Sequence, residues 1–270
     1  AKNLFADQLV GFSLITGTSG TGNSINLTLD ANLNNAAYQA MAGRKGVVAL
    51  YNYQTGEVLC MLSTPSFDPA DDAEVAKVAA GDSNYDGAYL NRFLSGTYTP
   101  GSTFKLVTSA AALETLHNEN SFSYTCKGSL TLNGEKITCP SVHGTQDFAT
   151  ALANSCNGAF ATLATQVGGK TLEKYAQEAG LTSKVNVNGL NSAAGNFTAG
   201  TSDNDVGWSG VGQYKDLVNP CAELTLMGCI AQGGSAATPR LLKSVTSSKG
   251  LPVAHVTTET SQIGWKTDTC

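Results

Sequence analysis

The chain has 270 residues, of which 41% are hydrophobic and 14% charged, a balance typical of a globular protein with an adequate core. Its formal net charge of -5 argues against nucleic-acid binding and against a basic membrane-binding patch. No apolar run approaches the roughly 18 residues of a membrane span, and the first residues lack the pattern of a signal peptide. We therefore expect a mature or excised segment of a longer protein.

The first residues predict a linker. Residues 1–16 show no clear period, and residues 17–22 form a polar, glycine-rich run that is typical of a flexible linker or turn. We expect residues 1–22 to connect to a missing N-terminal region and the folded domain to comprise residues 23–270.

A strand, a helix and a hairpin are predicted next. Residues 24–30 alternate apolar and polar side chains, which indicates a strand. Asp30 is a favourable N-cap residue, and one apolar face predicts a helix from there to about Ala42. The apolar, β-branched runs 46–51 and 57–62 predict a hairpin of a buried sheet with helices on its faces.

The stretch Tyr98–Lys105 carries the strongest chemical signal. A Pro-Gly turn precedes Ser102, and apolar residues follow with helical spacing. Lys105 lies three positions after Ser102, so both side chains share one helix face. A lysine can take the proton of a serine hydroxyl when burial lowers its pKa. A helix-capping serine with a surface lysine is the alternative, but the turn and the apolar helix favour a serine nucleophile with a lysine base.

Such a nucleophile needs a second proton relay and an amide that holds the substrate. Three Ser-x-Asn strings are candidates: Ser24–Asn26, Ser155–Asn157 and Ser202–Asn204. The first lies in a predicted strand and the third in a predicted loop, whereas the second joins two predicted helices. We therefore predict that Ser155 is the relay and Asn157 the amide. The alternative is that Ser155 only caps the following helix.

The sequence contains seven cysteines. Cys126 and Cys139 flank residues 130–137, a predicted hairpin with an Asn-Gly turn that would bring the two thiols together. A disulfide between them is plausible, although spacing alone does not establish pairing. A zinc site with His143 is a weaker alternative, because paired ligand spacing is absent. Two further cysteines lie in apolar elements and are predicted core residues: Cys60 and Cys229.

The remaining segments complete the prediction. Loops are expected in the polar stretch up to about Asp86 and at residues 181–212. Helices are predicted at 148–153, through 160–167, at 171–179 and from Pro220 to about Gly233, and strands at 240–245 and 252–256.

Taken together, these motifs resemble the transpeptidase domain of class B penicillin-binding proteins. The strings that carry the resemblance follow the family's order over nearly the whole chain: residues 63–69, 90–93, 98–105, 143–144, 151–157, 210–213 and 230–234. The resemblance implies an α/β (α+β) fold, in which helices flank an antiparallel central sheet and a second subdomain is helical.

The resemblance also implies roles for the four residues. Ser102 would be the acylated nucleophile, Lys105 its base, Ser155 the relay to the leaving group and Asn157 a contact of the substrate amide. The substrate would be the D-alanyl-D-alanine end of a peptidoglycan stem peptide, and β-lactams would acylate the same serine. No metal or cofactor is implied. The parent protein would be anchored in the cell membrane with its catalytic domain extracytoplasmic, alongside cell-wall synthesis or division proteins.

The sequence departs from the family at its third motif, Lys-Thr-Gly or Lys-Ser-Gly on a central strand. Neither string is present, and the nearest match is Lys266–Thr269. There Asp268 would place a side chain where close backbone approach is wanted, and its carboxylate would repel that of the substrate. We expect instead that this sequence ends before the motif and lacks the C-terminal part of the family's domain.

Two other functions fit the same motifs. A β-lactam sensor, or an inactive module of the division machinery, would tolerate an incomplete site. A serine β-lactamase or D,D-carboxypeptidase would use water in place of the acceptor amine. We rank the hydrolases lower, because the sequence shows no clear candidate for the base that would activate water to hydrolyse the acyl-enzyme.

Overall fold

The computed structural model describes residues 11–12, 19–20, 22–254 and 256–270. The predicted linker, residues 1–22, therefore lies largely outside the described residues. Two compact units divide the chain. Unit 1 comprises Ala1–Ser95, Val185–Ser192 and Ala236–Ser261, and unit 2 comprises Gly96–Lys184, Ala193–Ser235 and Gln262–Cys270. Among the described residues, no helix has both the length and the apolar character needed to cross a membrane.

Unit 1 is built on antiparallel strands. β4 (Gly46–Tyr51) and β5 (Val58–Thr64) form the predicted hairpin, and β14, β13 and β3 form a three-stranded sheet. The amide of Val58 donates to the carbonyl of Arg240 at 3.0 Å, which ties the hairpin to the segment before β13. The other strands are β3 (Ser24–Leu27), β13 (Leu242–Thr246), β14 (Pro252–Ala254), and the pairs β1 (Gly11–Phe12) with β2 (Ser19–Gly20), β10 (Asn186–Val187) with β11 (Leu190–Asn191), and β12 (Ser235–Ala237) with β15 (Thr260–Gln262).

The helices of unit 1 include one that the sequence did not reveal. α2 (Ala31–Met41) begins as predicted, with Asp30 accepting from the amides of its first turn. The expected polar loop instead contains α3 (Asp72–Ala79), capped by Asp71. α3 spans only 8 residues and fully buries none of them, so its apolar side chains, Val75 and Val78, give a weak signal within the polar stretch. The remaining helices are η1 (Ser83–Tyr85) and α4 (Arg92–Ser95).

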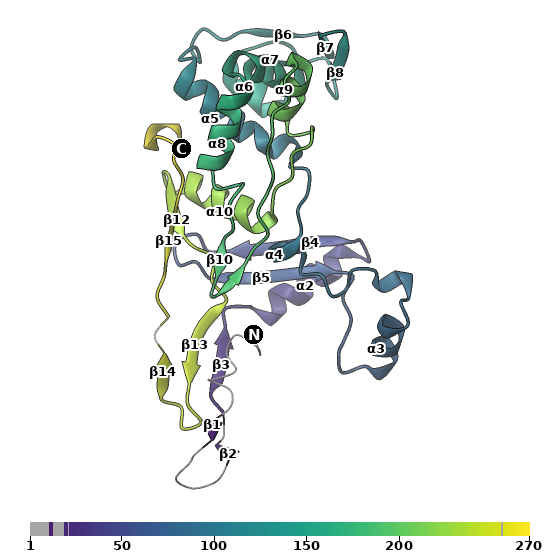
Figure 1. Ribbon diagram of the computed structural model, residues 1–270, viewed down its shortest axis with the longest axis vertical. Coiled ribbons are helices and arrows are strands. Elements are labelled where there is room, and N and C mark those ends of the chain that lie inside the picture. The colour runs from purple at the N-terminus through teal and green to yellow at the C-terminus, as the bar shows by residue number, and fades with distance from the viewer. Residues whose placement is uncertain (1–10, 13–18, 21, 255) are drawn as a thin grey trace. The chain divides into compact units, whose positions relative to one another are not determined.

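Unit 2 is mainly helical (Figure 1) and also carries two small antiparallel strand pairs. Its core packs buried side chains such as Phe160, Leu163 and Ile137 between helices and the β7–β8 hairpin. The elements are η2 (Gly101–Phe104), α5 (Lys105–Thr115), α6 (Phe148–Ala153), α7 (Asn157–Val167), α8 (Gly169–Glu178), α9 (Asp203–Val211), α10 (Pro220–Ala231) and η3 (Thr267–Thr269), with β6 (Tyr124–Cys126) paired to β9 (Gly144–Gln146) and β7 (Ser129–Leu132) to β8 (Glu135–Thr138). The α/β class with antiparallel sheets and flanking helices is therefore confirmed.

The loop predicted at residues 181–212 is wrong in part, because α9 occupies its end. Ser202 caps this helix by accepting from the amide of Asp205 at 3.1 Å. Glycines in the helix reduce its local propensity but permit close packing on α7. A Cβ added at Gly210 would lie 2.2 Å from the Cβ of Ala164. Packing against α7 stabilises this helix, and sequence periodicity does not reveal that contact.

Candidate active site

Ser102 and Lys105 lie at the entry to α5. The sequence predicted one α-helix from Ser102, whereas the structure begins with the 3₁₀ turn η2 and becomes α-helical at Lys105. In a 3₁₀ turn, side chains three positions apart eclipse one another. Accordingly, the Nζ atom of Lys105 lies 3.2 Å from the Oγ atom of Ser102. The serine is exposed, and the lysine beneath it retains only 1% of its accessible surface.

Gly212 holds the turn that presents the serine. Its carbonyl accepts from the amide of Gly101 at 2.9 Å. Gly212 has a φ of +82°, and an added Cβ would lie 2.1 Å from the carbonyl oxygen of Gly101. Only glycine fits this position without moving the backbone next to Ser102.

Ser155 lies between α6 and α7 in a left-handed conformation, with a φ of +50°. A non-glycine residue rarely adopts this conformation, and here the surrounding helices hold it. Both its Oγ atom, at 2.8 Å, and its carbonyl oxygen, at 2.7 Å, accept from Nζ of Lys105. Ser155 is not the cap of α7, because Cys156 occupies that position and makes no side-chain capping bond.

Asn157 is the first residue of α7, and two hydrogen bonds fix its amide. Its Oδ1 atom accepts from Nζ of Lys105 at 2.8 Å, and its Nδ2 atom donates to the carbonyl of Thr138 at 2.8 Å. The structure thus brings Ser102, Lys105, Ser155 and Asn157 together around one nitrogen atom, whereas their chemical roles remain predictions.

The surroundings of Lys105 favour a base. Burial lowers the pKa of Lys105 to about 8. The neighbouring Cys156 and Cys139 act in the opposite direction and raise this pKa, but their effect is smaller than that of burial. Nζ contacts four oxygen atoms, but an ammonium carries only three protons. A neutral amine can instead donate to two of them and accept the proton of Ser102. The site therefore has the parts for activating a serine hydroxyl.

The sequence-based prediction assigned no role in this site to two residues, Thr138 and Gly212. Thr138 contributes only a backbone carbonyl, which leaves no chemical signal in the sequence. Gly212 lies in the string 210–213 that carries the family resemblance, but its fit against Gly101 depends on the tertiary fold. The nearest match to the third motif also does not form a strand. Lys266 precedes the 3₁₀ turn η3, and its amide donates to Glu114 Oε1 at 2.8 Å.

The cysteines differ from the prediction. All seven are free thiols in this structure, so the plausible disulfide between Cys126 and Cys139 is not formed. The hairpin between them is present as β7 and β8. The Sγ atom of Cys139 instead lies 3.8 Å from that of Cys156, next to the Ser-x-Asn serine. Cys60 and Cys229 are buried, as predicted.

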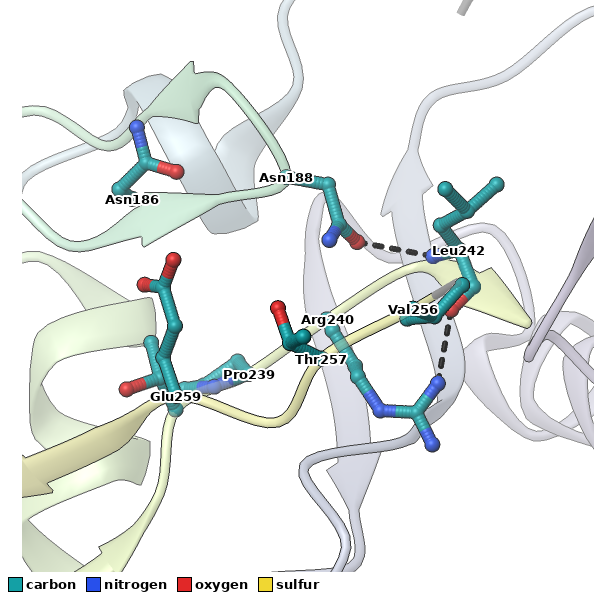
Figure 2. A pocket seen from close by; sticks show the side chains of 9 residues that line it. Asn186, Asn188, Pro239, Arg240, Leu242, Val256, Thr257 and Glu259 are labelled. Atoms are coloured by element: carbon teal, nitrogen blue, oxygen red, sulfur yellow. Dashed lines mark hydrogen bonds between the residues drawn. The ribbon is translucent and has the colours of Figure 1, made fainter. Parts of the chain in front are cut away.

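Unit 1 contains a separate polar pocket of about 130 Å³ (Figure 2). Asn188 accepts from the amide of Leu242 at 2.8 Å, and Arg240 donates to the carbonyl of Leu242 at 2.7 Å. Arg240 also pairs with Glu57 at 3.3 Å. These bonds fasten the β10–β11 turn to β13, which indicates a structural role for Asn188 and Arg240. None of the four predicted site residues lines this pocket.

Comparison with known proteins agrees with the motif-based resemblance. Residues 46–268 match the family model for the penicillin binding protein transpeptidase domain. The chain is 29% identical over 276 residues to the peptidoglycan D,D-transpeptidase PbpA of Mycobacterium tuberculosis, covering 95% of this chain and 55% of that protein.

Two solved structures have the same fold. Penicillin-binding protein A from M. tuberculosis, as its penicillin G acyl-enzyme complex, superimposes with a TM-score of 0.81 at 26% identity and covers 100% of this chain and 65% of that one. A peptidoglycan synthase complex that coordinates polymerization and crosslinking gives a TM-score of 0.79 at 25% identity, covering 99% and 54%. The chain thus spans about half to two thirds of the length of these relatives.

Proposed function

The chain belongs to the family of penicillin-binding protein transpeptidase domains, and from this we propose that it is the acyl-transfer domain of a peptidoglycan D,D-transpeptidase. The observation that carries the proposal is the contact of one buried amine, that of Lys105, with Ser102, Ser155 and Asn157. The relatives named for this activity, and the relative captured as a penicillin acyl-enzyme, support it.

In the first half-reaction, Lys105 takes the proton of Ser102 as the serine Oγ attacks the carbonyl carbon between the two D-alanines. The carbon–nitrogen bond then breaks, an ester forms on Ser102, and D-alanine leaves. Ser155 lies 2.8 Å from Nζ of Lys105, so it can pass the proton to the departing amine. Asn157 would orient the substrate through its side-chain amide.

In the second half-reaction, an amine of a neighbouring stem peptide attacks the ester. Its proton returns along the same path, the crosslink forms, and Ser102 regains its hydroxyl. A β-lactam would acylate the same oxygen by ring opening and would have no departing fragment. We place this chemistry outside the cytoplasmic membrane, in a membrane-anchored protein that works with cell-wall synthesis partners. The similarity to a peptidoglycan synthase complex supports such partners.

The test is intact-mass spectrometry after incubation with a labelled penicillin. We expect a single adduct on the parent chain, none on Ser102→Ala, and an unchanged adduct on the control Ser123→Ala, which alters an exposed serine outside the site. An adduct that survives in Ser102→Ala would refute the assigned nucleophile. Incubation with a stem peptide then separates the functions: a transpeptidase releases D-alanine and forms a crosslink with an added amine, a hydrolase only releases D-alanine, and a sensor does neither.

A further inference from the structure

Four potential metal ligands converge beside the Ser-x-Asn motif. Cys126 ends β6, Cys139 and His143 follow β8, and Cys156 precedes α7. One ligand atom from each residue lies within 4.8 Å of all the others. The contributing segments are separate in sequence, so this convergence is a property of the fold. We propose that these residues form a structural Zn²⁺ site of three thiolates and one imidazole.

The separation of two of the ligand atoms suits zinc. Ligands at the corners of a tetrahedron, with zinc–sulfur bonds of about 2.3 Å, have sulfur atoms about 3.8 Å apart. The Sγ atoms of Cys139 and Cys156 are separated by 3.8 Å. A disulfide would require about 2.05 Å. Two thiols in simple contact also reach this separation, so the inference depends on the convergence of all four ligands.

The surroundings of the ligands support the inference independently. The amide of Gly128 donates to the sulfur of Cys126 at 3.4 Å, and the amide of Gly158 donates to the sulfur of Cys139 at 3.3 Å. Amide donors of this kind stabilise thiolates and orient them toward a metal. The Nδ1 atom of His143 is buried and, among the described residues, has no hydrogen-bond partner. A metal bound at Nδ1 would satisfy this nitrogen.

The ligand set also determines the kind of metal and its role. Three sulfurs and one nitrogen favour zinc over magnesium or calcium, which prefer oxygen ligands. Four protein ligands leave no open position for water or substrate, which is typical of a structural site. Cys139 and His143 are only half-buried, so an ion can enter from their side. The ion would cross-link β6, the segment after β8 and the start of α7.

The direct test measures metal content and coordination in the full chain. Protein purified under reducing conditions without chelator is expected to contain about one zinc ion per chain by elemental mass spectrometry. After exchange, cobalt(II) is expected to give the visible bands of a tetrahedral site and a near-ultraviolet thiolate-to-cobalt charge-transfer band. Cys139→Ser and His143→Ala are each expected to weaken zinc binding at least about tenfold. The matched controls Cys270→Ser and His117→Ala, which change residues outside the cluster, are expected to bind zinc like the parent.

Two results would overturn the proposal. One is a folded, reduced parent chain that neither retains zinc nor takes up cobalt into a thiolate site. The other is peptide mapping of non-reduced protein that finds a disulfide within the cluster. Because both results are read on the parent chain, the test does not depend on whether a ligand variant folds.

Discussion

The side chain of Asn157 donates to the backbone carbonyl of Thr138 across 2.8 Å. This bond joins the end of β8 to the first residue of α7 and turns the Oδ1 atom of Asn157 toward Lys105. A residue outside the motifs thus orients one inside them. The arrangement also explains why the hairpin and the proposed catalytic residues belong to one packed unit.

Asn157→Asp is expected to reduce β-lactam acylation by about 100-fold. The change removes the donor to Thr138 and places a carboxylate beside Lys105, where it would favour the ammonium and remove the base. Time-resolved mass spectrometry of the penicillin adduct measures the rate. Asn191→Asp, at an exposed position of β11, is the matched control and should acylate like the parent. An Asn157→Asp rate within about threefold of the parent would contradict the positioning role.

Acylation should depend on pH through the neutral form of Lys105. Burial lowers the pKa of this amine to about 8, so its neutral fraction increases as the pH rises toward that value. Below it, the acylation rate is expected to increase about tenfold per pH unit, and above it to level off. Acylation rates measured with one penicillin between about pH 6 and 9.5 test whether the rate increases with pH. A flat profile over that range would mean that Lys105 is not the titrating base.

Gly212→Ala should damage the turn that presents Ser102. The new Cβ would lie 2.1 Å from the carbonyl oxygen of Gly101, at a φ of +82°. We expect a loss of about 2–4 kcal/mol in the free energy of unfolding, together with slower acylation. Gly180→Ala separates the causes, since Gly180 has a φ of +77° but no atom within 4 Å of an added Cβ. That control should lose about 1 kcal/mol and acylate normally. Equal losses of unfolding free energy in the two variants would exclude the contact with Gly101 as the cause of the destabilisation.

Gly210→Ala tests the contact between α9 and α7. Its Cβ would lie 2.2 Å from the Cβ of Ala164, which predicts a destabilisation of about 1–3 kcal/mol in denaturant melts. Ala164→Gly removes the opposing methyl group. The double variant should therefore recover part of the loss, with a coupling energy above about 0.5 kcal/mol. Strictly additive effects would mean that the two positions do not share one tightly packed space.

Local signals in the sequence were sufficient for much of this fold. The cap at Asp30 and the start of α10 at Pro220 lie where the sequence predicted them, because each depends on neighbouring residues alone. Helices stabilised in other ways were missed. α3 is short and fully buries none of its residues, and α9 depends on contacts of its glycines with α7.

In the candidate site too, features set by neighbouring residues were predicted and features set by tertiary contacts were missed. Ser102 and Lys105 are three residues apart, so helical geometry alone predicts their proximity. The carbonyl of Thr138 carries no chemical signature in the sequence, and the string 210–213 does not show that Gly212 packs against Gly101, because both contacts depend on the tertiary fold. The convergence of Cys126, Cys139, His143 and Cys156 was not predicted, for a related reason. These four ligands come from three segments rather than from the close pairs by which zinc sites are usually identified.

Loss of zinc should slow acylation, because Cys156 lies between the two residues of the Ser-x-Asn motif. A metal bound to its sulfur would constrain the left-handed turn at Ser155 and the start of α7 further than the surrounding helices do alone. Removing the metal with a chelator under reducing, anaerobic conditions is expected to lower the penicillin acylation rate about tenfold, and added zinc should restore it. Cys139→Ser should show the low rate with or without chelator, and Cys270→Ser should respond like the parent. If zinc is lost and the rate does not change, the metal stabilises the hairpin without positioning the motif. The predicted effect of zinc on the acylation rate would then be wrong. The proposed zinc site would stand, because its own test measures metal binding and not acylation.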